Sequence, residues 1–247
     1  MEQLGVLLIH GFTADHHGMR PIAEIAEELG LAVEMPLLRG HGLTYRDLRG
    51  VCWDDWVADV SQALAALKQR AERVIIAGFS LDGLLALATA AQHEDLDSIV
   101  ALAPALRIAH PLAPLAPLAR GWMSFVPMGK SVAYSDPSLA IGDTSYSRLA
   151  IDAFCSFHRA TRRVERMLPR IKAPLLVVHA LRDRVIRPEA ATIAYNHVTS
   201  TEKQLVWLER SGHAMLDDVD AGDVLRHVRG FLAGRLAAAA GATLSGT

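Results

Sequence analysis

Cysteine is scarce in this chain, whose 247 residues include only Cys52 and Cys155. The two lie in unrelated sequence contexts and match neither a disulfide framework nor the paired spacing of a metal site. We expect both to be buried free thiols, the state in which unpaired cysteines are most often found. A chain of this length can bury a sizeable core, so it needs no disulfide or metal to fold.

An excess of charge of one sign is also lacking. The 25 basic and 27 acidic residues leave a formal net charge of −2, and the sequence has no basic run. This balance argues against a nucleic-acid partner. Asp15, His16 and His17 could suggest a metal site, but adjacent side chains point in different directions and no second ligand cluster accompanies them. We therefore predict no metal and no cofactor.

Long apolar runs are absent as well. The chain has no stretch of about 18 apolar residues, which excludes an integral membrane helix on the sequence evidence. Residues 1–3 lead directly into an apolar segment without the basic region and cleavage site of a signal peptide. A cytoplasmic location is the resulting expectation; an upstream signal that is not part of this sequence is the alternative. The sequence leaves the oligomeric state open.

Short apolar runs that alternate with longer helical patterns are what the sequence does contain. Near-continuous apolar strands between helices predict an α/β fold, with a parallel sheet covered by helices on both faces. The expected strands are residues 5–9, 31–38, 73–77, 98–103, 174–179 and 204–208, and the expected helices are residues 21–29, 54–70, 81–91, 188–197 and 217–236.

Residues 104–169 interrupt this alternation. The segment begins with prolines spaced among leucine and alanine, contains no recognisable strand, and ends in a helical piece at 149–168. An insertion this long in a compact domain is usually functional, so we predict an inserted lid between two parts of one core, residues 1–103 and 170–238. A flexible tail is expected at 239–247. The apolar lid side chains either line a substrate site or hold the lid to the body; the candidates for the site are Trp122, Met123, Phe125 and Met128.

Ser80 lies in the run Gly78-Phe79-Ser80-Leu81-Asp82-Gly83, between an apolar strand and an Ala/Leu-rich helix. A sharp strand-to-helix turn exposes a serine as a nucleophile, and small neighbours such as Gly78 allow the two backbones to approach. The strict G-x-S-x-G pattern fails because its last position is Asp82. The alternative is a turn serine that only caps the helix.

His213 and Asp183 complete a possible catalytic triad. His213 follows the last predicted strand and Asp183 follows the strand before it, in the chain order serine, acid, histidine. A carboxylate there can fix the tautomer of the histidine and stabilise its imidazolium form. The alternatives are an exposed loop histidine, an aspartate that caps a helix or forms a salt bridge, or Asp217 or Asp218 as the acid.

His10-Gly11-Phe12 directly follows the first predicted strand. Acyl transfer needs two backbone N–H groups that meet the oxyanion, and we predict that Phe12 and Leu81 supply them. A plain strand-to-helix turn is the alternative for Phe12. His10 and His41 are expected to hold loops by hydrogen bonding.

With these motifs the sequence resembles the bacterial carboxylesterase and monoacylglycerol lipase branch of the α/β-hydrolase family. The resemblance implies the α/β-hydrolase fold with a mostly parallel six-stranded sheet, and ester hydrolysis through an acyl-enzyme on Ser80. A small-molecule ester, such as a short- to medium-chain acyl ester or a monoacylglycerol, is the implied partner. The matching segments are residues 7–13, 37–42, 54–60, 78–83, 181–186 and 211–214.

Relatives in this branch usually have glycine at the position of Asp82. The sequence hypothesis is that Asp82 lowers or reshapes activity, and that it would raise the pKa of His213 if the two lay close together. Other chemistries of the same fold remain open: a carbon–carbon bond hydrolase, a thioesterase or a perhydrolase. A haloalkane dehalogenase is disfavoured because its nucleophile would be aspartate. A non-catalytic ligand-binding protein is the alternative from a different class.

Overall fold

A six-stranded sheet forms the centre of the protein, for which a computed structural model describes residues 3–13 and 16–244. The strand order is β2-β1-β3-β4-β7-β8 and every neighbouring pair is parallel. This confirms the predicted sheet. The strands are β1 (Leu4–Ile9), β2 (Ala32–Glu34), β3 (Arg73–Phe79), β4 (Ser98–Leu102), β7 (Leu175–Ala180) and β8 (Lys203–Leu208).

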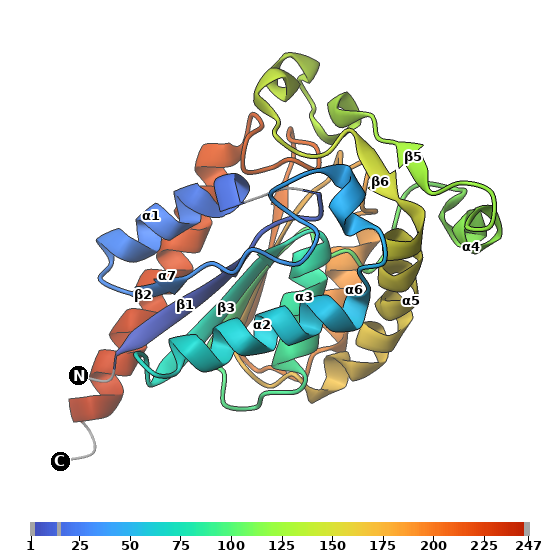
Figure 1. The fold of residues 1–247 in the computed structure, drawn as a ribbon. Coiled ribbons are helices and arrows are strands. Elements are labelled where there is room, and N and C mark those ends of the chain that lie inside the picture. Colours follow the sequence, from blue (N-terminus) through green and yellow to red (C-terminus); the bar gives the residue numbers. More distant parts are fainter. Residues whose placement is uncertain (1–2, 14–15, 245–247) are drawn as a thin grey trace.

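Alternate side chains of each strand enter two different hydrophobic cores. In β1, Leu7 and Ile9 face one core and Val6 and Leu8 face the other. The first core is shared with the helices at 53–67, 81–90, 151–167 and 189–197, and the second with those at 20–28 and 221–244. Figure 1 shows the pair α1 and α7 on one side of the sheet and α2 and α3 on the other. The helices are α1 (Arg20–Glu28), α2 (Trp53–Leu67), α3 (Leu81–Ala90), α4 (Ala116–Ala119), α5 (Ile151–Met167), α6 (Glu189–His197) and α7 (Ala221–Leu244).

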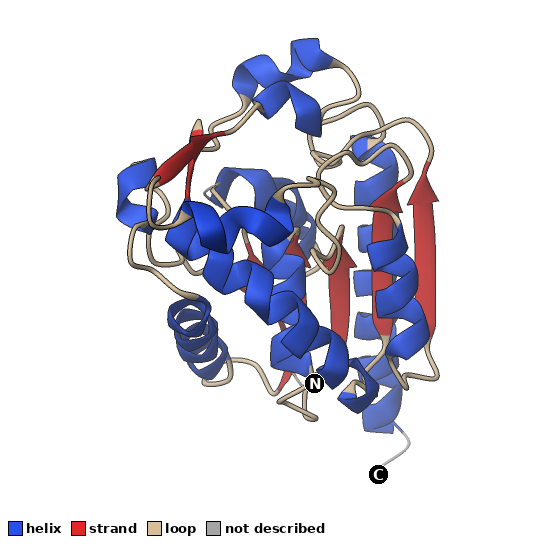
Figure 2. Ribbon diagram, turned by 90° about the vertical axis from the view of Figure 1, so that its right-hand side faces the viewer, coloured by secondary structure: helices blue, strands red, loops and turns tan. Residues whose placement is uncertain are grey.

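The inserted segment differs from its prediction. It contains two strands, β5 (Phe125–Pro127) and β6 (Arg148–Ala150), which pair antiparallel, although no strand was expected there. Three-residue strands are too short to show an alternating pattern in the sequence. The strands of the main sheet point toward this segment (Figure 2), so it covers the end of the sheet at which parallel strands place functional loops. Short 3₁₀ turns occur at His16–Met19, Tyr45–Leu48, Ala113–Leu115, Lys130–Ala133, Pro137–Gly142 and Leu168–Arg170.

Two elements of the main fold, β2 and α7, end at other residues than predicted. Strand β2 stops at Glu34, before the predicted end at residue 38, and Pro36 just beyond it has no N–H to donate to a sheet. Helix α7 continues to Leu244 through the segment predicted as a flexible tail, because its alanines favour helix. The last three residues of that predicted tail, 245–247, lie outside the described residues. No helix in the described ranges is long and apolar enough to cross a membrane.

Candidate active site

Ser80 occupies a strained turn between β3 and α3. Its φ of 61° and ψ of −120° lie in a region that residues other than glycine rarely adopt. The turn is held by the Ser80 N–H, which donates to the carbonyl of Leu102 at 2.8 Å. A Cβ at Gly78 would lie 2.1 Å from the carbonyl oxygen of Asp82, so only glycine lets the strand and helix approach this closely.

The three predicted triad residues lie together. His213 Nε2 is 2.8 Å from Ser80 Oγ, and His213 Nδ1 is 2.7 Å from Asp183 Oδ2. They come from the loops after β3, β7 and β8, and all three side chains are almost fully buried. In this geometry His213 can take the proton of Ser80 while Asp183 stabilises the imidazolium that forms.

The carboxylate of Asp183 is held from both sides. Its Oδ1 accepts hydrogen bonds from the backbone N–H groups of Val185 and Ile186, each at 2.8 Å. Burial acts to raise the pKa of Asp183, but the charge and hydrogen bond of His213, together with His179 and the Ile186 amide, outweigh it and leave the pKa below its usual range. Asp183 is therefore ionised wherever the triad would work.

A second histidine behind the acid was missed by sequence reasoning. His179 is fully buried in β7, with Nε2 3.2 Å from the carbonyl of Ile186 and 3.4 Å from Asp183 Oδ2. Burial lowers the pKa of His179, so the ring is neutral, and two facing oxygens require the proton on Nε2. The signal available in the sequence was a histidine inside an otherwise apolar strand, four positions before the acid.

The alternative acids occupy other positions. Asp218 accepts hydrogen bonds from the N–H groups of Gly212 and Ser135 and does not bond the ring of His213 in the described structure. Asp217 lines the cavity beside Ser80, and burial raises the pKa of its carboxyl. Asp183 is thus the acid that the geometry selects among the three candidates.

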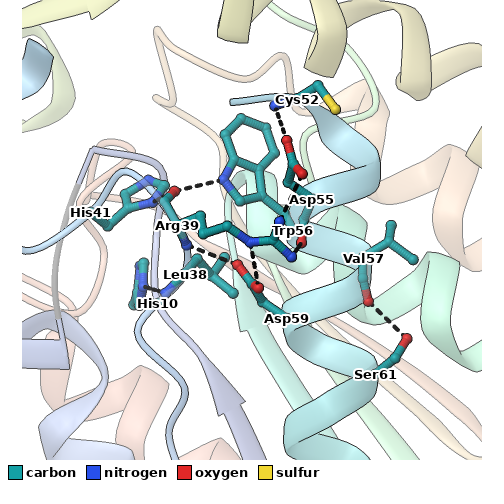
Figure 3. A network of polar contacts seen from close by, with 10 residues as sticks. All are labelled: His10, Leu38, Arg39, His41, Cys52, Asp55, Trp56, Val57, Asp59 and Ser61. Atoms are coloured by element: carbon teal, nitrogen blue, oxygen red, sulfur yellow. Dashed lines mark hydrogen bonds and ion pairs between the residues drawn. The ribbon is translucent and has the colours of Figure 1, made fainter. Parts of the chain in front are cut away.

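The predicted oxyanion residues, Phe12 and Leu81, line the same cavity as Ser80 and His213. The loop that carries Phe12 is held by His10, whose Nε2 accepts the N–H of Leu38 at 3.1 Å (Figure 3). The Nδ1 of His10 lies 3.1 Å from the carbonyl of Gly11. With Nε2 as an acceptor, Nδ1 is the ring nitrogen that can donate to Gly11, and the ring fixes the first loop against the segment at 37–42. This agrees with the loop-holding role expected for it.

A polar network around the exposed Arg39 side chain anchors the 37–42 segment to α2 (Figure 3). The guanidinium of Arg39 contacts Asp59 and Asp55 at 2.8 Å each, and its carbonyl accepts from both the Trp56 indole at 3.0 Å and the Nδ1 of His41 at 3.1 Å. His41 then packs edge-on against the ring of Phe12, with the ring centroids 5.8 Å apart. Burial lowers the pKa of His41 to about 4, so its ring is neutral.

The cavity beside Ser80 has a volume of about 450 Å³ and is lined mainly by apolar groups from the inserted segment 104–169 and the body. Of the four lid residues predicted to line it, only Met128 does so. Trp122 is 92% exposed and Met123 46% exposed, and Phe125 packs edge-on against Tyr45 instead. Residues 122–125 lead into the β5–β6 pair, and the position of this pair in the fold cannot be predicted from a sequence pattern. The apolar lining residues that were missed include Ile108, Val132, Leu139, Leu149, Phe154 and Phe157.

Asp82 is fully buried at the start of α3, and neither carboxyl oxygen has a hydrogen-bond partner in the described structure. Burial raises the pKa of Asp82 well above its usual value, which keeps the carboxyl neutral. The cavity is lined by Phe79, Ser80 and Leu81 but not by Asp82. Asp82 makes no hydrogen bond to His213 in the described structure, and an effect of Asp82 on the pKa of His213 stays a hypothesis.

Metal ligands do not cluster in the part of the chain that the structure describes: no group of three or more histidine, cysteine, aspartate or glutamate side chains could hold an ion there. Asp15, which belongs to the motif considered above, lies outside the described residues. The two cysteines are free thiols, with Cys155 buried and Cys52 half-buried.

Comparison with known proteins adds independent information. Residues 3–220 match the family described as serine aminopeptidase, S33. The chain is 31% identical over 230 residues to a thermostable monoacylglycerol lipase of Bacillus sp. (strain H-257), covering 93% of this chain and 90% of that protein. It is 27% identical over 229 residues to a carboxylesterase of Bacillus subtilis (strain 168), covering 92% and 91%. A solved structure of the metagenome-derived lipolytic enzymes LipS and LipT superposes with a TM-score of 0.87 at 29% identity, covering 94% of both chains.

Proposed function

Because the chain belongs to the serine aminopeptidase S33 family, within which it is similar to lipases and esterases, we propose that it is a serine ester hydrolase that works through an acyl-enzyme. The observation that carries the proposal is the hydrogen-bonded series Ser80–His213–Asp183, which opens onto an apolar cavity. The base is then within hydrogen-bonding distance of both the nucleophile and the orienting acid.

In the proposed reaction, Ser80 Oγ attacks the ester carbonyl as His213 Nε2 takes its proton. The N–H groups of Phe12 and Leu81 stabilise the tetrahedral oxyanion. Collapse expels the alcohol, which receives the proton from His213, and leaves an acyl group on Ser80. Water, deprotonated by His213, then releases the carboxylic acid and restores the serine.

The cavity supports acyl esters of short to medium chain or monoacylglycerols as the substrate class. Its volume of about 450 Å³ is lined by leucine, isoleucine, valine and phenylalanine side chains that suit an alkyl chain. The family description refers to aminopeptidases, whereas both named bacterial relatives act on esters by their names. The cytoplasmic location expected from the sequence stays a prediction.

A panel of p-nitrophenyl esters from acetate to laurate, with monoacylglycerols, a thioester and amino-acid p-nitroanilides alongside, tests this proposal. We expect hydrolysis of the esters with a preference for short or medium chains and little action on the anilides. Ser80→Ala should lower kcat by on the order of 10⁶-fold. Failure to hydrolyse an ester of any chain length would contradict the esterase assignment, and selective action on anilides or thioesters would reassign the chemistry.

A further inference from the structure

Asp218 lies where the lid meets the loop that carries His213. Its Oδ2 accepts the N–H of Gly212 and the N–H of Ser135, both at 2.7 Å. Its Oδ1 accepts the hydroxyl of Ser135 at 2.8 Å and the N–H of Val219 at 2.9 Å. One carboxylate thus connects a lid residue to the residue that precedes the catalytic base.

The carboxylate is built into this position. The residue is 5% exposed, and each of its two oxygens accepts two hydrogen bonds. Burial acts to raise the pKa of Asp218, but the N–H groups of Gly212, Ser135 and Val219 outweigh it and hold the pKa below its usual range. Hydrogen bonds to an ionised acceptor are about twice as strong as neutral ones. The Asp218 carboxylate therefore binds Ser135 and Gly212 more strongly than a neutral acceptor would.

The lid backbone also contacts the histidine loop directly. The N–H of Ala214 donates to the carbonyl of Ala133 at 2.8 Å. A Cβ at Gly212 would lie 2.6 Å from that same carbonyl oxygen, so glycine is what permits the approach. Residues on both sides of His213 are therefore bonded to lid residues 133–135, either directly or through Asp218.

From these contacts we propose that Asp218 is a positioning residue that locks lid residues 133–135 to the 212–214 loop and so holds His213 in line with Ser80 and Asp183. The inference rests on the proposed function, since it assigns His213 the role of base. Asp218 acts through His213 and does not touch the reacting atoms. Movement of the lid and placement of the base are coupled as a consequence.

A neighbouring aspartate provides a matched control. Asp220 accepts the N–H groups of Arg210 and Ser211, both at 2.9 Å, and pairs with the Arg210 guanidinium at 2.6 Å. It holds the same loop and bonds no lid residue among those that the structure describes. Asp218→Asn replaces one acceptor oxygen by an amide that faces N–H or O–H donors. Asp220→Asn makes the same replacement where the partners belong to the body, and there it also removes the ion pair with Arg210.

Two measurements test the proposal: steady-state kinetics on p-nitrophenyl acetate, and backbone hydrogen exchange of residues 133–135 and 212–214. For Asp218→Asn we expect kcat to fall about 10- to 100-fold with little change in KM, because a misplaced base slows the chemical step. Exchange should rise in both segments. In Asp220→Asn, exchange should rise near residues 210–211 and stay unchanged in the lid. Ser135→Ala, which keeps the backbone donor, should show a smaller form of the Asp218→Asn result and serves if that variant fails to fold.

Wild-type kcat in a folded Asp218→Asn protein would overturn the positioning role, and exchange that rises in the histidine loop but not in the lid would overturn the coupling. An equal rise of lid exchange in the two asparagine variants would also overturn it. The exchange readout does not require ester hydrolysis. The proposed function would be contradicted if the wild type hydrolysed no ester. If exchange still rose in both segments of Asp218→Asn, the contact between the lid and the histidine loop would nevertheless be supported.

Discussion

At the scale of single residues, Asp82 is expected to affect stability more than turnover. The sequence places it beside the nucleophile, which suggested an effect on turnover. Both carboxyl oxygens are buried without a hydrogen-bond partner among the described residues, and Asp82 does not line the cavity. An unpaired buried polar group lowers stability, so we expect Asp82 to act mainly on the free energy of unfolding.

The pH dependence of stability tests this directly. Because folding raises the pKa of Asp82, the unfolded chain ionises above about pH 3.9 while the folded carboxyl keeps its proton. Each pH unit above that point costs the folded state about 1.4 kcal/mol until the folded pKa is reached. Asp82→Asn cannot ionise, so urea unfolding should show it gaining stability over the wild type as pH rises from about 4 to 8. A difference that does not change with pH would contradict a neutral buried acid.

His41 gives the opposite pH dependence. Its pKa falls from 6.5 to about 4 on folding, because burial disfavours the imidazolium. The unfolded chain therefore binds a proton below pH 6.5 and the folded chain does not, so stability is lost as pH falls from 6.5 to 4, by about 3 kcal/mol in all. In His41→Asn that part of the acid loss should disappear from unfolding curves measured across the window. An equally steep loss in the variant would show that His41 does not titrate in this way.

At the scale of elements, the turn from β3 to α3 is set by one glycine. The residues around Ser80 were identifiable from an apolar strand followed by G-x-S and a helix. The exact backbone approach was not, because it depends on how α3 lies against β3 and β4. The 2.1 Å gap between a Cβ at residue 78 and the Asp82 carbonyl shows that this approach leaves no space for a side chain.

Gly78→Ala should therefore disrupt the turn. The clash is with backbone, which cannot move aside as a flexible side chain can, so we expect a loss of several kcal/mol or failure to fold, and no reaction of Ser80 in the protein that remains. Gly234→Ala is the control, since a Cβ there meets nothing within 4 Å and alanine favours helix by up to about 1 kcal/mol. Thermal unfolding of both variants checks the pair. Wild-type stability in Gly78→Ala would refute the close approach.

At the scale of the whole molecule, the sequence was informative where the pattern is periodic or ordered along the chain. Alternating apolar strands and helices predicted the six parallel strands, and the order of Ser80, Asp183 and His213 predicted which loops meet. The cavity walls were not predictable, because the path of the inserted segment 104–169 depends on tertiary contacts. Trp122 looked like a substrate-binding residue by composition, yet it is 92% exposed. His179 was missed because no pattern distinguishes a buried functional histidine from a structural one.

One of those tertiary contacts is made by Tyr146 in the inserted segment. The hydroxyl of Tyr146 donates to the carbonyl of Gly40 at 3.0 Å and accepts the N–H of Leu43 at 3.1 Å. Tyr146→Phe removes both bonds while keeping the ring, so unfolding free energy should fall by about 1–3 kcal/mol. Hydrogen exchange should rise in the lid around residues 144–148. Unchanged exchange there would show that the hydroxyl does not anchor the lid.

The central claim is that Ser80 is an activated nucleophile, and its reaction with a fluorophosphonate probe tests that claim most directly. We predict that intact-mass analysis shows one covalent adduct per chain, that peptide mapping places it on Ser80, and that His213→Ala slows the labelling strongly. Ser80→Ala should not be labelled. A folded wild-type protein that takes up no probe, or one labelled at another residue, would contradict the account.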